Sequence, residues 1–175
     1  MTKGFQQLAR YNRWANAKLY EAALKMPEER YRAATGVFFR SLHGTLNHLL
    51  VADRIWLRRL TGTGDDPRRL DAILFEDRFR LATARAAEDE RMVAVVDGYD
   101  ARALDSLVTY QTLSGQPQEQ VLAEVLQHVF NHQARHRGQA HACISIAGEE
   151  PPALDLLLFQ RGLPAPDLAA LASAG

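Results

Sequence analysis

Three observations in the sequence predict an all-α protein built as a four-helix bundle. Four long segments carry apolar side chains at alternating spacings of three and four residues, the period of an amphipathic helix. The segments that connect them are short, and the chain shows no internal repeat. The composition, with 47% hydrophobic and 24% charged residues in a chain of 175, is that of an ordinary globular protein. A chain of this length can bury a core as one domain over residues 1–175.

The first two predicted helices each carry one polar residue inside an apolar stripe. The stripe over residues 5–26 includes Asn12 and stops at Pro27, which ends a helix. The stripe over residues 42–60 includes Asp53 and is followed by turn-forming residues. A polar side chain on a buried face needs a partner, so both residues are candidates for a site inside the bundle.

The rest of the chain predicts two further long helices and some shorter elements. Residues 75–96 are rich in Ala, Arg, Glu and Leu, and residues 118–147 form the strongest helical segment. Between them, residues 106–113 alternate apolar and polar side chains before a turn over residues 114–117, which predicts a short extended segment or hairpin. After the fourth helix we expect a short helix over residues 154–159 and a frayed tail of small residues over 163–175.

Charge and hydropathy exclude several classes of function. Lys plus Arg and Asp plus Glu both number 21, so no net field favours nucleic acid or an anionic membrane surface. The longest stretch without a charged residue, Ser106–Gln118, is mostly polar and much shorter than the about 20 apolar residues of a spanning helix. The single Cys143 excludes an intrachain disulfide, and no apolar signal segment follows Met1. We therefore expect a cytoplasmic protein with neither a nucleic-acid nor a membrane partner.

Three histidines share the apolar stripe of the last long helix. At about 100° per residue, His128, His132 and His136 fall within one arc of roughly 120°. Neutral imidazoles one turn apart can direct their lone pairs at one divalent ion about 2.0–2.1 Å away. His132 and His136 are therefore candidate metal ligands, and His48 is the candidate third ligand because it borders the stripe of a facing helix. His43 lies about 140° from His48 around that helix and cannot meet the same ion.

The histidines also have competing interpretations that the sequence leaves open. A core histidine is often satisfied by a backbone carbonyl rather than by a metal, and this applies most directly to His48. His128 is either a third ligand from the same helix or part of a substrate pocket. In the second case, Asn12 and Trp56 are the other candidate pocket residues.

Asp53 and Cys143 have two interpretations each. Asp53 either orients a ligating histidine or pairs with an arginine such as Arg10 or Arg13. Asp53 and His128 are the two candidates for a catalytic group. Cys143 lies on the same face as the histidines, but a free cysteine in a helix is more often a small core residue than a nucleophile.

Three motifs together resemble the DinB/YfiT-like family of metalloenzymes. They are Tyr11–Asn16, Leu46–Leu50 followed by Asp53, and His128–Gln139 with an HxxxHRGQ signature. The likeness spans nearly the whole chain and implies an up-down-down-up four-helix bundle with a divalent metal, nickel or zinc ahead of iron or manganese. The family's ligands map onto His48, His132 and His136.

The resemblance also implies partners and chemistry. Relatives include transferases and isomerases that use low-molecular-weight thiols such as bacillithiol, mycothiol or glutathione, and members are commonly homodimers. The family name refers to induction by DNA damage and implies no contact with DNA. We therefore expect a small-molecule substrate and a homodimer.

Three functional hypotheses follow. In the favoured one, the metal lowers the pKa of a bound small thiol, which attacks a small electrophile, so the protein is a thiol S-transferase. In the second, a metal-bound water hydrolyses an ester or amide with Asp53 as general base; the lack of a Glu between His132 and His136 disfavours a protease. In the third, a non-catalytic stress-response dimer holds a metal closed by a fourth ligand, His128.

Overall fold

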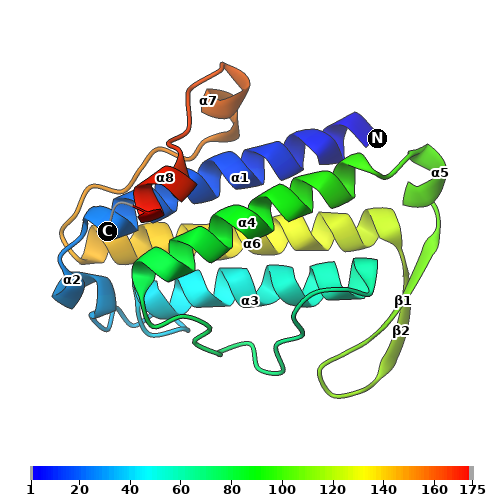
Figure 1. Cartoon of the computed structure of the whole chain (residues 1–175), viewed down its shortest axis with the longest axis horizontal. Helices are drawn as coiled ribbons and strands as arrows, with labels where there is room; N and C mark the ends of the chain where they lie inside the picture. The colour runs from blue at the N-terminus through cyan, green and yellow to red at the C-terminus, as the bar shows by residue number, and fades with distance from the viewer. Residues whose placement is uncertain (1, 174–175) are drawn as a thin grey trace.

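Four long helices make up most of the computed structural model, which describes residues 2–173 (Figure 1). Their bounds are α1 (Thr2–Lys25), α3 (Leu42–Thr61), α4 (Arg78–Asp97) and α6 (Leu122–Ile146). Each lies within four residues of the range that the apolar periodicity predicts. The predicted all-α fold class is confirmed.

The long helices pack around a shared interior. Helix α1 contacts α4 and α6, and α3 contacts the same two helices from the opposite side. In Figure 1 the chain runs along α1 and α6 in one direction and along α3 and α4 in the other. Helices α3 and α6, which carry the predicted metal ligands, are thus direct neighbours.

Capping groups explain where α3 and α4 begin. The Ser41 side chain accepts a hydrogen bond from the Gly44 amide at 3.1 Å, and the Asp77 carboxylate accepts one from the Arg80 amide at 2.7 Å. Helix α3 ends at Gly62, whose φ of 71° lies in the left-handed region that glycine adopts without a steric penalty.

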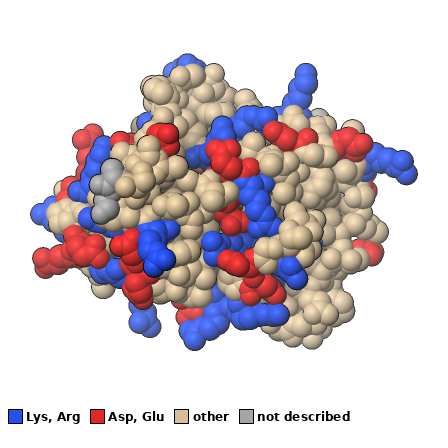
Figure 2. Space-filling view, viewed as in Figure 1, with Lys and Arg blue, Asp and Glu red and all other residues tan. Residues whose placement is uncertain are grey.

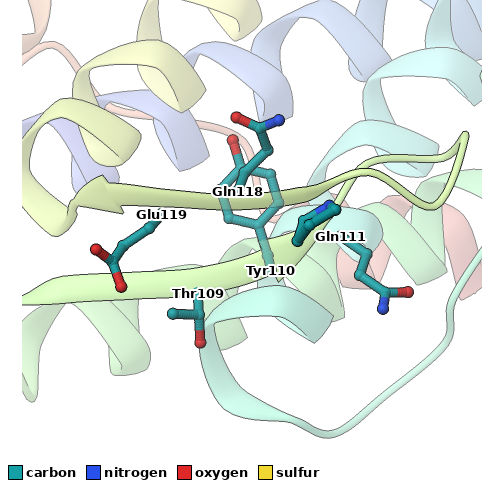
Figure 3. A pocket seen from close by; sticks show the side chains of 6 residues that line it. Thr109, Tyr110, Gln111, Gln118 and Glu119 are labelled. Atoms are coloured by element: carbon teal, nitrogen blue, oxygen red, sulfur yellow. The ribbon is translucent and has the colours of Figure 1, made fainter.

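The predicted hairpin is present, and it takes residues that the periodicity assigned to the last helix. Strands β1 (Leu107–Gln111) and β2 (Pro117–Val121) pair antiparallel, with Leu107 opposite Val121. The helix prediction over 118–121 is therefore wrong, and α6 begins at Leu122. Residues 118–120 are polar and exposed, and the backbone groups of β2 pair across the hairpin instead of entering the helix. An open groove of about 600 Å³ runs along the hairpin beside Tyr110 and Gln118 (Figure 3).

Four short helices complete the described chain. They are α2 (Glu28–Arg32), α5 (Ala101–Leu104), α7 (Leu156–Gln160) and α8 (Leu168–Ser173). Helix α7 agrees with the short helix expected over 154–159, but α8 corrects the expectation of a frayed tail. Leu168 and Ala172 are buried where α8 packs on α4 and α1, which holds this part of the tail in place. The last two residues of the predicted tail lie outside the described chain.

A band of buried polar side chains divides the apolar core into two clusters. One cluster contains Leu19, Leu46 and Ile144, and the other contains Leu57 and Val129. Between them along every long helix lies a set of buried residues that we call the polar belt: Asn12, Asn16, Asp53, Arg85, Asp89, Gln133 and Arg137. Both polar residues noted in the first two apolar stripes belong to it.

The surface has no dominant charge on the face viewed in Figure 2. Basic and acidic side chains are interspersed there in small groups, in keeping with the zero formal net charge. Ion pairs between Arg10 and Asp97 and between Arg13 and Glu90 link α1 to α4. Across residues 2–173, none of the helices has the length and apolar character needed to cross a membrane.

Candidate metal centre

The three histidines predicted as ligands lie together between α3 and α6. His48 comes from α3, while His132 and His136 are one turn apart on α6. Each can offer one ring nitrogen such that the three atoms all lie within 4.8 Å of one another. The ring centroids are 5.2 Å apart for His48 and His132, 4.5 Å for His48 and His136, and 4.3 Å for His132 and His136. The predicted cluster therefore forms without any side chain from a third helix.

Hydrogen bonds on the far side of two rings fix which nitrogen is free. Nδ1 of His48 lies 2.8 Å from the Leu70 carbonyl oxygen, which can only accept, so Nδ1 carries the proton and Nε2 keeps its lone pair. That Nε2 atom is buried and has no hydrogen-bond partner. Nδ1 of His136 lies 2.7 Å from Oε1 of Gln139, which orients the second ring in the same way. A buried, unpartnered lone pair is what a metal ion would satisfy.

Burial keeps the imidazoles neutral, which is the form that binds a metal. Removal from water lowers the pKa of His48 to about 4; the Leu70 carbonyl opposes this shift and His136 adds to it. Burial together with the charges of its neighbours, His136 foremost, lowers the pKa of His132 to about 3. The pKa of His136 is lowered by burial as well, against the opposing effect of the hydrogen bond that its ring donates to Gln139. Protons thus compete weakly for these sites at neutral pH.

An aromatic ring covers the cluster at the N-terminal end of α3. The Phe39 ring stacks on His48 with centroids 3.8 Å apart and an interplanar angle of 17°, and it meets His136 at 5.6 Å. Phe39 can approach because Gly44 leaves room for its backbone: a Cβ at Gly44 would overlap the Phe39 carbonyl oxygen. His43 points elsewhere, with Nδ1 2.9 Å from the Tyr31 hydroxyl, as its position around the helix predicts.

Asp53 belongs to the polar belt rather than to the histidine cluster. Its Oδ2 lies 2.9 Å from the Arg85 guanidinium, and its Oδ1 accepts a hydrogen bond from Nε2 of Gln133 at 2.5 Å. The arginine partner is thus Arg85, not Arg10 or Arg13, which pair with acids of α4. Burial raises the pKa of Asp53 despite the opposing effect of Arg85. With both oxygens engaged, this carboxylate is poorly placed to act as a general base.

The other predicted pocket residues lie in two places. Asn12 is buried in the polar belt, where it accepts a hydrogen bond from Arg137 and lies 3.4 Å from Asp89.

Trp56 and His128 lie on the His132 side of the cluster. Their ring centroids are 5.3 Å apart, and the His128 ring lies 5.8 Å from the His132 ring. His128 is exposed and does not join the group of candidate ligands among residues 2–173.

Sequence reasoning missed several groups that position the candidate ligands. Gln139 follows His136 by less than one helical turn, so the spacing alone could have found it. Leu70 contributes only a backbone carbonyl from the connection between α3 and α4, and no side-chain pattern signals such a contact. Gln133 donates to the Leu49 carbonyl at 3.1 Å as well as to Asp53, and so ties α6 to α3 beside the ligands.

The fold and the cluster together define an all-α protein with a candidate three-histidine metal centre. The model of the DinB family matches residues 1–167, so the chain belongs to the DinB family. It is 25% identical over 162 residues to Protein DinB of Bacillus subtilis (strain 168), an alignment that covers 87% of this chain and 91% of the relative. The family that the three sequence motifs indicated is confirmed.

Proposed function

We propose that this DinB-family protein binds one divalent metal ion through Nε2 of His48, His132 and His136. The observation that carries the proposal is the buried, unpartnered Nε2 of His48, which faces two further imidazoles of lowered pKa. The Leu70 carbonyl and Gln139 supply the outer hydrogen bonds that ligating histidines usually make. Imidazole nitrogens suit nickel, zinc and iron, whereas manganese prefers oxygen ligands; nickel and zinc are the ions we favour.

The donor set supports an open site in preference to a closed structural one. Within the described chain, the group of candidate ligands contains three residues, whereas structural zinc sites use four. His128, the residue that could have closed the site, is exposed and stands on the outer side of His132. This arrangement favours a catalytic centre over a dimer that merely stores or is stabilised by metal.

We further propose metal-dependent thiol S-transfer to small electrophilic substrates. A divalent ion bound here would lower the pKa of a coordinated small thiol and so supply its thiolate, whose sulfur would bond to the electrophilic carbon of the substrate while the bond from that carbon to its leaving group breaks. The protein's part is then to hold the three imidazoles, to keep Phe39 over His48 against water, and to leave the His132 side open. Hydrolysis is the second candidate, and it demands more because a water must also lose a proton to a general base. The ion pair of Asp53 with Arg85 disfavours it.

The first test is metal content by elemental mass spectrometry on untagged protein purified without chelators. We expect about one ion per chain in wild type and loss of that ion in His48→Ala, His132→Ala and His136→Ala. His141→Ala, which removes a histidine of α6 outside the cluster, is the matched control and should keep the ion. Wild type that stays empty after incubation with zinc, nickel or manganese would refute metal binding.

A second test separates the two chemistries once metal binding is established. The protein is loaded with cobalt, and its visible absorption is followed as glutathione or 2-mercaptoethanol is added at millimolar concentration. Thiol transfer predicts a saturable spectral change, because sulfur would enter the open position. An unchanged spectrum, together with metal-dependent cleavage of an ester probe, would instead favour the hydrolase.

A further inference from the structure

Arg59, in the last turn of α3, is a half-buried cation without an acidic partner. Of the ion pairs among residues 2–173, none involves Arg59, and the nearby Asp66 carboxylate is paired with Arg68 at 3.1 Å. Burial lowers the pKa of Arg59, against smaller opposing effects of Tyr110 and Asp66. A partly desolvated charge of this kind is stabilised by an anion that binds beside it.

Two aromatic rings hold the Arg59 guanidinium in place. Its Cζ lies 4.6 Å from the Trp56 ring centroid and 4.8 Å from that of Tyr110, and the two rings meet edge to face at 5.2 Å. The Tyr110 hydroxyl donates to Oε1 of Gln120 at 2.5 Å, which anchors that ring to the hairpin. We call Arg59, Trp56 and Tyr110 the cationic platform. A guanidinium fixed between rings has its N–H fork preorganised for a carboxylate.

A continuous row of rings joins the cationic platform to the histidine cluster. His132 is followed by His128 at 5.8 Å, and His128 is followed by Trp56 at 5.3 Å. Along α3, roughly 16 Å of helix axis separates His48 from Arg59, at about 1.5 Å per residue. Arg59 and Trp56 are only partly buried, so the platform can be reached from solvent, and Tyr110 also lines the open groove of the hairpin (Figure 3).

We propose that the cationic platform is a second substrate contact, and that the substrate is an elongated organic anion whose carboxylate pairs with Arg59 while its other end reaches the histidine cluster. The second half of this proposal rests on the proposed metal-dependent function, whereas binding at Arg59 does not. The row of rings offers stacking surface to the apolar body of such a molecule. A divalent ion held by three neutral histidines would add positive charge at the far end and favour the same anionic class.

The test uses 4-phenylbutyrate and its neutral amide as probes, with affinity measured by ligand-observed NMR on the full-length chain. We expect the acid to bind at least about tenfold more tightly than the amide, since a charge-assisted hydrogen bond is lost in the amide. Arg59→Gln should remove most of that preference. Arg58→Gln removes the same charge from the neighbouring exposed position and should leave the preference for the acid over the amide unchanged.

Two further measurements keep the proposal independent of the metal site and of folding. The titration is repeated after removal of metal with a chelator, and the preference for the acid should persist. Arg59→Lys keeps the charge without the planar fork and should bind the acid with intermediate affinity, while circular dichroism verifies that each variant is folded. Equal binding of acid and amide, equal effects of the two glutamine variants, or loss of binding with the metal would each overturn the assignment. Failure of the metal-centre proposal would appear separately, in the elemental analysis.

Discussion

Replacing Arg85 with methionine tests whether the polar belt is held together by charge. The Arg85 guanidinium is fully buried and lies 2.9 Å from both Asp53 and Asp89. Methionine fills similar space but leaves two buried carboxylates without this cation. Removing one partner of a buried ion pair costs about 3–5 kcal/mol, so we expect the free energy of unfolding to fall by about that amount near pH 8.

The pH dependence of this loss identifies its electrostatic origin. In wild type, burial raises the pKa of Asp89 to about 6, and Arg85 is the main group that opposes the rise. Below the unfolded pKa of 3.8, the proton on buried Asp89 stabilises the folded state, and this contribution is lost as the pH rises through 6. The difference between the two pKa values corresponds to about 3 kcal/mol. Without Arg85 the pKa rises further, and folded Arg85→Met holds a proton between pH 6 and 8 that wild type has lost. The difference in the free energy of unfolding between wild type and Arg85→Met should therefore be smaller at pH 6 than at pH 8.

Urea unfolding of the metal-free protein, followed by circular dichroism at several values between pH 6 and 8, measures both quantities. Arg80→Met removes the same charge from an exposed position of α4, and should change the unfolding free energy by less than about 0.5 kcal/mol. The reasoning fails if Arg85→Met costs no more than Arg80→Met. It fails as well if the cost of Arg85→Met is the same at pH 6 and pH 8.

Two further substitutions test the groups that position the ligands. Gln139→Ala removes the acceptor of the His136 Nδ1 proton, and we expect a loss of about 10- to 100-fold in metal affinity, measured by competition with a chelator; unchanged affinity would contradict this role. Gly44→Ala places a Cβ against the Phe39 carbonyl and should lower the unfolding free energy by about 1–3 kcal/mol. Gly138→Ala, in a helix with nothing within 4 Å of the added carbon, should instead raise the unfolding free energy by up to about 1 kcal/mol. If both substitutions change the unfolding free energy in the same direction in urea, the steric argument is contradicted.

The parts of this protein that follow from periodic burial could be predicted from the sequence. An apolar stripe dictates a helix wherever it recurs, and two histidines four residues apart on such a stripe must share a face. This reasoning located the long helices and brought His132 and His136 together. His48 required one more assumption, that its helix faces theirs, and the packing of α3 against α6 supports it.

The parts that depend on tertiary contact could not be predicted. Residues 118–121 run directly into the apolar stripe of the last helix, and only pairing with β1 decides that they form a strand. Helix α8 is rich in Ala and Leu but only six residues long, too short to be stable alone, and it forms where Leu168 finds buried surface. The sequence indicates that an arginine can pair with Asp53, but only the packing of the helices decides that it is Arg85 of α4 and not an arginine of α1. The Leu70 carbonyl is chosen by the path of a loop, and a main-chain group leaves no trace in residue identities.

The polar belt sets how far one helix can slide along another. All four long helices contribute to it, and a shift by one turn moves a side chain by about 5.4 Å, which would place a charge or amide of the belt against an apolar cluster. Gln133 stands between His132 and His136 in the sequence and is bound to Asp53 and to the carbonyl beside His48. The belt therefore sets the register of the candidate metal centre, because residues outside the histidine cluster determine which turn of α6 faces His48.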